Sequence, residues 1–106
     1  MDLTKIIEEI RASVASNYNN FKGIYLYGSR AKGLAKEDSD IDVVILFDSE
    51  LTNDEELKLA GLIGDIEYKY DVFIDSHPYT MTALERNPFY YESVVEEGIY
   101  FGKEAA

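Results

Sequence analysis

The sequence contains no cysteine, so the chain forms neither disulfides nor zinc–thiolate sites. It also has no apolar run approaching the roughly 18 residues that a membrane-spanning helix needs. Its N-terminus lacks the basic and then apolar pattern of a secretory signal peptide. These absences lead us to expect a cytoplasmic protein that makes no contact with a membrane.

Basic residues are scarce, since ten Lys and Arg face 21 Asp and Glu and give a formal charge of −11. Such a chain repels a phosphodiester backbone, so we expect no direct nucleic-acid partner. A basic protein partner fits the charge better, although acidity also favours solubility. The 106 residues, 46% of them hydrophobic, suffice for one modest core, and we predict a single domain over residues 1–106.

Periodic apolar residues predict three main helices. Thr52 and Glu55 are spaced to form a capping box at the start of the second helix. An Asn-Pro pair favours the start of the third helix, and a glycine favours its end. The predicted helices cover residues 3–18, 53–67 and 88–97.

Short runs rich in β-branched and aromatic residues predict four strands, over residues 24–27, 41–47, 70–75 and 99–101. A short connection makes the first two strands antiparallel, whereas a helical connection makes the second and third parallel. The predicted fold class is therefore α/β in the broad sense (α+β), a small mixed sheet packed with helices.

The most informative stretch, residues 28–42, reads G-S-R-A-K-G-L-A-K-E-D-S-D-I-D and lies between the first two strands. Asp40 and Asp42 alternate along a strand, so their side chains share a face and their Cα atoms lie roughly 6.5 Å apart. Like charges held so close repel each other unless a cation joins them. Hard oxygen ligands suit Mg²⁺, and a pair of such ions serves in-line phosphoryl or nucleotidyl displacement.

The glycine-serine corner before these acids can hold phosphate. Gly28 allows a sharp turn and the close approach of a ligand. Ser29 can cap the short helix that follows and bond a phosphate oxygen, beside the N–H groups of the helix N-terminus. Arg30 either neutralises phosphate charge or is an exposed helix cation. The plainer reading of the whole stretch is an acidic surface hairpin whose glycine and serine only make a turn.

Residues 28–42, with G-S-x-A-x-G and then S-D-I-D, resemble the signature of nucleotidyltransferases that share the DNA polymerase β-like fold. The chain is most similar to the minimal single-domain branch, described as antitoxins of HEPN-domain toxins. That resemblance implies Mg²⁺-dependent transfer of AMP from ATP to a hydroxyl, namely a tyrosine of a cognate HEPN toxin. It assigns catalysis and metal binding to Asp40, Asp42 and a third acid, and nucleotide binding to Gly28, Ser29, Arg30 and Ser39.

Two residues compete for the third carboxylate, Asp71 and Asp75. If the strand over 70–75 runs parallel to the strand over 41–47, its start lies beside the first two acids. Asp71 stands at that start, whereas Asp75 would lie about 13 Å further along. We therefore predict Asp71 as the third catalytic and metal-binding residue.

The sequence does not identify the acceptor of the nucleotide. One alternative is a non-catalytic antitoxin that neutralises a HEPN toxin by forming a complex. Another is nucleotidyl transfer to a small molecule such as an aminoglycoside. The complete signature favours the enzyme, because a pure binding module has no need of all three acids. Association into a homo-oligomer or a hetero-oligomer stays open.

Overall fold

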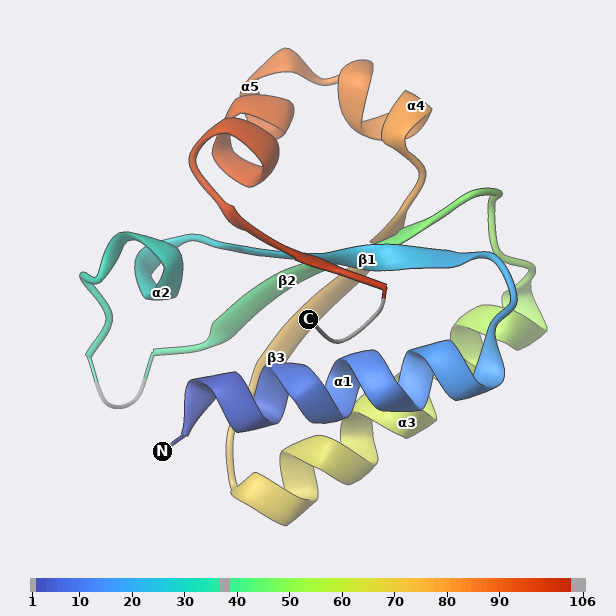
Figure 1. Ribbon diagram of the computed structural model, residues 1–106, viewed down its shortest axis with the longest axis horizontal. Coiled ribbons are helices and arrows are strands. Elements are labelled where there is room, and N and C mark those ends of the chain that lie inside the picture. The colour runs from blue at the N-terminus through green and yellow to red at the C-terminus, as the bar shows by residue number, and fades with distance from the viewer. Residues whose placement is uncertain (1, 37–38, 104–106) are drawn as a thin grey trace.

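A four-stranded mixed sheet lies at the centre of the computed structural model, with the strand order β3-β2-β1-β4 (Figure 1). Strand β1 pairs antiparallel with β2 and with β4, while β2 and β3 are parallel. The predicted antiparallel and parallel pairings are therefore confirmed. The strands are β1 (Phe21–Tyr27), β2 (Ile41–Phe47), β3 (Ile74–Tyr79) and β4 (Ile99–Gly102).

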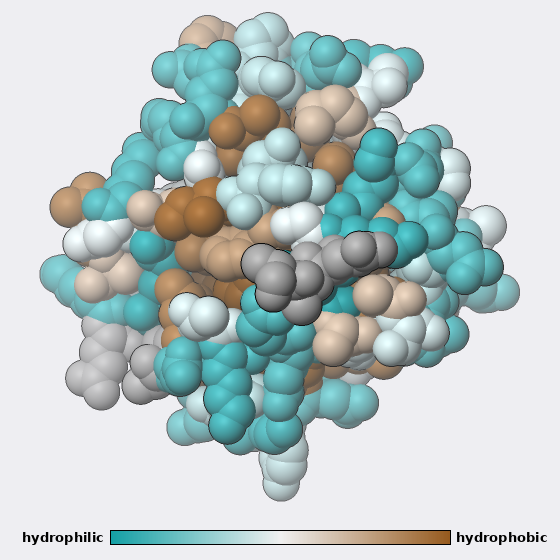
Figure 2. Space-filling model, viewed as in Figure 1, coloured by the Kyte–Doolittle hydropathy of each residue, from teal (hydrophilic) through white to brown (hydrophobic). Residues whose placement is uncertain are grey.

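The structure describes residues 2–36 and 39–103, so Glu37 and Asp38 of the signature lie outside the described residues. Within those ranges, no helix is both long enough and apolar enough to cross a membrane. Figure 2 shows hydrophilic side chains over most of the rim of the molecule, with apolar ones gathered toward the middle of the view.

Two long helices, α1 (Leu3–Asn17) and α3 (Asn53–Tyr70), cover one face of the sheet side by side (Figure 1). The predicted capping box is present at the start of α3, where the hydroxyl of Thr52 accepts a bond from the amide of Glu55. The Glu55 carboxylate accepts the Thr52 amide in return. The main core forms here from Ile6, Ile7, Ile10, Val14, Ile24, Leu26, Ile41, Val43, Ile45, Phe47, Leu59 and Ile63.

Shorter helical pieces cover the other face of the sheet, namely α4 (Met81–Glu85), α5 (Pro88–Tyr91) and a π-helical turn η1 (Glu92–Glu96). The single helix predicted over 88–97 is therefore present without a break over residues 88–96, but its second half is π-helical. Its predicted start is confirmed, because the Asn87 side chain accepts a bond from an amide of α5 and proline follows it. A second, smaller core lies under these helices and contains Val44, Leu46, Leu84 and Val94.

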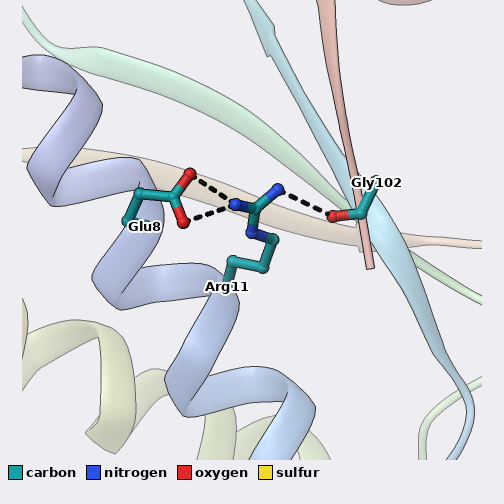
Figure 3. Close-up of polar contacts among 3 residues, drawn as sticks. All are labelled: Glu8, Arg11 and Gly102. Carbon is teal, nitrogen blue, oxygen red and sulfur yellow. Dashed lines mark hydrogen bonds and ion pairs between the residues drawn. The ribbon is translucent and has the colours of Figure 1, made fainter. Parts of the chain in front are cut away.

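The last strand is fixed to the first helix by a buried arginine. Arg11 of α1 is only 8% exposed, and its guanidinium donates a 3.2 Å hydrogen bond to the backbone carbonyl of Gly102 (Figure 3). Its other terminal nitrogen contacts the carboxylate of Glu8, one turn earlier in the helix. This charge-assisted bridge holds β4 against the sheet edge.

Strand β3 begins at Ile74 instead of residue 70, because α3 continues three residues past its predicted end. Asp71 ends that helix in the left-handed conformation, with φ 52° and its amide bonded to the carbonyl of Glu67. The Glu67 carboxylate then accepts the amide of Ile74, at 2.9 Å. The predicted strand over 70–75 is therefore wrong by about one helical turn.

Candidate active site

Three side chains form a row across the sheet on the face that α4 and α5 cover. In the observed register, Tyr27 of β1 pairs with Asp42 of β2, and Asp42 pairs in turn with Asp75 of β3. Asp42 is two residues before Val44, which packs in the smaller core, so alternation puts its side chain on that same face. The row therefore contains two adjacent carboxylates and one phenol.

The expected position of Asp71 beside Asp40 and Asp42 is wrong. Asp71 is exposed at the C-terminal cap of α3, three residues before β3 begins. Asp75 instead occupies the register position next to Asp42. The start of the parallel strand does lie beside the acids, as expected, but that start is Ile74 and not residue 70.

The two carboxylates of the row carry like charges that repel each other. Burial raises the pKa of Asp42, and the negative charges of Asp75 and Asp40 raise it further. Asp40 is exposed just before β2, so its charge acts on the row from the rim. Repulsion of this kind is relieved by a divalent cation, and the donor set is the oxygen-rich one that Mg²⁺ prefers.

In residues 2–36 and 39–103 no three acidic or histidine side chains already stand close enough together to hold a metal ion. The row supplies two adjacent oxygen donors, Asp42 and Asp75, and Asp40 is the acid at its rim. These residues fit a divalent cation, which Asp42, Asp75 and Asp40 would hold and which would neutralise their charges.

The glycine corner lies directly against the first carboxylate of the row. Gly28 has φ 73° and ψ −154°, and a Cβ atom built on it would stand 2.5 Å from an Asp42 side-chain oxygen. Only glycine combines this backbone conformation with so close an approach. The predicted corner and the predicted acid are therefore brought together.

The short helix α2 (Ser29–Lys32) follows this corner. Gly28, not Ser29, occupies its N-cap position, and no side chain caps the helix. The capping role expected for Ser29 is therefore wrong. Its hydroxyl stands on the first turn of α2, next to the corner.

Arg30 and Ser39 also come together, at the end of the segment that leads into β2. The Arg30 guanidinium donates a 2.8 Å hydrogen bond to the backbone carbonyl of Ser39. The Ser39 hydroxyl accepts the amide of Lys36, at 2.9 Å. These bonds brace the backbone immediately before Asp40.

Sequence reasoning did not find three further polar groups on this face. The His77 Nε2 atom lies 3.1 Å from a carboxylate oxygen of Asp75. The hydroxyls of Tyr27 and Tyr90 are 2.9 Å apart. Alternation along β3 puts residues 75 and 77 on one face, but the predicted strand ended at residue 75 and so left His77 outside it.

A cavity of about 400 Å³ lies at the opposite end of β2 and β3, between the loop after β2 and α4. Its lining includes Phe47, Tyr79 and Arg86, but none of the described signature residues. The acidic row is therefore not enclosed by this cavity. It lies on a partly exposed part of the sheet, where a second molecule can reach it.

Comparison with known proteins adds to this geometry. A sequence model of the nucleotidyltransferase domain family matches residues 7–101. A candidate protein adenylyltransferase from Methanocaldococcus jannaschii is 30% identical over 83 residues, which cover 77% of this chain and 84% of that protein. A spectinomycin 9-adenylyltransferase from Campylobacter jejuni is 42% identical over 52 residues, which cover 42% of this chain and 20% of that protein.

Solved structures share the fold. A toxin–antitoxin complex with AMP-PNP contains a chain that matches with a TM-score of 0.64 at 22% identity, over 94% of this chain and 73% of that one. A tri-AMPylated HEPN toxin of Shewanella oneidensis in complex with an MNT antitoxin provides a match with a TM-score of 0.60 at 19% identity, over 97% and 72%. Because the nucleotidyltransferase domain model matches residues 7–101, nearly all of the described chain, this protein belongs to the nucleotidyltransferase domain family.

Proposed function

We propose that this protein transfers AMP from ATP to a hydroxyl group, with Asp40, Asp42 and Asp75 as its acids. The observation that carries the proposal is the contact of Gly28 with Asp42, which is itself paired with Asp75. A glycine whose backbone a phosphate can approach closely thus adjoins two carboxylates whose repulsion favours a bound cation. Nucleotidyl transfer needs both features at one place.

The nucleotide would bind with its outer phosphates at Gly28 and Ser29, against the N–H groups of the first turn of α2. Asp42 and Asp75, with Asp40 at the rim, would hold Mg²⁺. When bound, the ion supplies charge neutralisation for the triphosphate and Lewis-acid polarisation of the phosphoryl oxygens. The hydrogen bond from Arg30 to the carbonyl of Ser39 would hold the start of β2 in place during the reaction.

A residue of this protein then accepts the proton that the acceptor hydroxyl releases. The acceptor oxygen forms a bond to the α-phosphorus, the bond from that phosphorus to the bridging oxygen breaks, and pyrophosphate leaves. The proton of the acceptor hydroxyl passes to the Asp75 carboxylate, which acts as the general base. His77, 3.1 Å from that carboxylate, lies beside the charge that changes.

The proposed acceptor is a tyrosine of a cognate HEPN toxin. Two facts support this choice: the shared fold with chains from toxin–antitoxin complexes, one of which holds an AMPylated HEPN toxin, and the net charge of −11, which favours a basic protein partner. The acidic row is reachable from the surface, as transfer to a side chain of another protein requires.

The test measures label transfer from α-³²P-ATP with Mg²⁺ to the cognate HEPN protein. The wild type is compared with Asp42→Asn, Asp75→Asn and Asp71→Asn. The last is a matched control, because asparagine tolerates the left-handed conformation that Asp71 adopts and the residue lies outside the row. We expect Asp42→Asn and Asp75→Asn to lose transfer and Asp71→Asn to keep it.

Loss of transfer in Asp71→Asn together with activity in Asp75→Asn would reverse the assignment of the third acid. A toxin silenced equally well by Asp42→Asn would instead show neutralisation by complex formation. Label on a small molecule, with no partner protein present, would identify a different acceptor class.

A further inference from the structure

Two half-buried tyrosines, Tyr27 and Tyr90, lie at the acidic row, and the proposed reaction assigns no role to them. We infer that the Tyr27 hydroxyl, held in place by Tyr90, donates a hydrogen bond to the α-phosphate of the bound nucleotide. This inference rests on the proposed function, because it requires a nucleotide on the row. It adds a substrate contact that lies outside the glycine corner and the acids.

The position of Tyr27 follows from the sheet register. Tyr27 is the direct partner of Asp42 across the β1–β2 pair, so the two side chains leave the same face next to each other. A tyrosine side chain is longer than an aspartate side chain. Its hydroxyl therefore reaches further from the sheet than the carboxylate, toward the level at which a phosphate joined to that carboxylate by a cation would lie.

Tyr90 of α5 keeps the phenol in that place. The two hydroxyls are 2.9 Å apart, and the rings meet edge to face with centroids 5.6 Å apart. The Tyr90 ring also packs on Tyr79 of β3, with centroids 5.4 Å apart. Tyr90 thus spans from β1 to β3 above the sheet, and its position is fixed by two ring contacts and one hydrogen bond.

The hydroxyls of Tyr27 and Tyr90 have one proton more than their mutual hydrogen bond requires. A tyrosine hydroxyl with the ordinary pKa of about 10 is neutral at physiological pH, so the two phenols carry two protons between them. One proton forms the bond between the hydroxyls, so the other is available to an acceptor at the row.

The acceptor that the geometry offers is a phosphoryl oxygen. Tyr27 borders the row through its pairing with Asp42, so a nucleotide held on the row would bring a phosphoryl oxygen to this hydroxyl. A neutral donor beside the carboxylates binds phosphate without adding negative charge. Preorganised donors of this kind also stabilise the charge that develops on a reacting phosphoryl group.

The experiment measures binding of α,β-methylene-ATP with Mg²⁺ by calorimetry, because this analogue cannot transfer its nucleotide. We expect Tyr27→Phe to weaken binding about tenfold, the loss of one hydrogen bond to a charged group. Tyr90→Phe frees the Tyr27 hydroxyl to rotate, and we expect a smaller loss, about threefold. Tyr79→Phe is the matched control, since it keeps the ring contact with Tyr90, and it should bind like the wild type.

A second readout separates contact from stability. The ³¹P resonance of the α-phosphate in the bound analogue should shift in Tyr27→Phe but not in Tyr79→Phe, whereas a merely structural role would leave it in place. Wild-type binding and an unchanged α-phosphate resonance in Tyr27→Phe would overturn the inference alone. Failure of the wild-type protein to bind the analogue would overturn the proposed function, and this inference with it.

Discussion

Replacing Gly28 with alanine should destabilise the protein more than the same change at Gly33 or Gly61, because two separate penalties meet at this residue. Its φ of 73° and ψ of −154° lie in a region that only glycine occupies freely. An added Cβ would also stand 2.5 Å from an Asp42 side-chain oxygen. The backbone penalty is about 1–3 kcal/mol, and displacing the carboxylate adds about 1 kcal/mol.

Three other glycines separate these penalties. Gly33 has φ 71° but no neighbour within 4 Å of its built Cβ, so Gly33→Ala should cost about 1–2 kcal/mol from backbone strain alone. Gly61, inside α3, has no positive φ and no such neighbour, so Gly61→Ala should stabilise the protein by about 0.5–1 kcal/mol. Gly98 has ordinary φ, but its Cβ would meet the carbonyl oxygen of Val94 at 2.1 Å, so its penalty is purely steric.

Urea unfolding monitored by circular dichroism measures these free energies. A loss of about 3 kcal/mol in Gly28→Ala corresponds to a melting temperature lower by roughly 10–25 °C for a domain of this size. In an Asp42→Ala background the steric part disappears, and the cost of Gly28→Ala should fall by about 1 kcal/mol. If Gly28→Ala and Gly33→Ala cost the same in both backgrounds, the inferred contact between the corner and the acid is refuted.

Three further changes test other parts of the structure. Thr52→Ala should cost about 1 kcal/mol in urea unfolding, because it removes the capping box of α3; no loss would contradict that role. Arg11→Met should cost about 2 kcal/mol and should speed amide hydrogen exchange in β4 above all, since it leaves the Gly102 carbonyl unpaired; uniform exchange across the sheet would contradict this. Asp42→Asn should stabilise the metal-free protein at pH 7 but not at pH 4. The pKa of folded Asp42 lies above its unfolded value, so ionisation of Asp42 costs the folded state stability as the pH rises through that range; equal effects at both pH values would refute it.

Most of the element order could be predicted from local patterns. Strand β2 was predicted to the residue, because a continuous apolar run follows directly after Asp42. The capping box fixed the start of α3, and an Asn-Pro pair fixed the start of α5. These features depend on neighbouring residues only, which is why the sequence alone reveals them.

The position of β3 could not be predicted in the same way. Residues 70–79 contain an apolar run, Val72-Phe73-Ile74, and then a polar run, Asp75-Ser76-His77, so no alternation marks where the strand begins. The predicted strand ended at residue 75, before Pro78. In the fold, β3 is an edge strand, where proline is tolerated. The choice between Asp71 and Asp75 thus depended on the length of α3, which tertiary packing decides.

The π-helical turn η1 could likewise not be predicted from the sequence pattern. Residues 88–97 have the periodicity of an ordinary α-helix. Gly98, however, lies close to the carbonyls of Val94 and Leu26, so the end of this helix lies close against β1. The extra residue per turn in η1 accommodates this approach. Such close contact between distant segments has no counterpart in local sequence.

The two faces of the sheet differ in composition, and this difference explains why only some residues of the candidate site could be predicted from the sequence. The face under α1 and α3 holds the larger core, so its residues follow hydrophobic patterning. The face under α4 and α5 combines a small core with the row of Tyr27, Asp42 and Asp75. Asp42 belongs to a contiguous motif and could be recognised. Tyr27 and Asp75 reach it only through strand register, because the three residues stand on different strands.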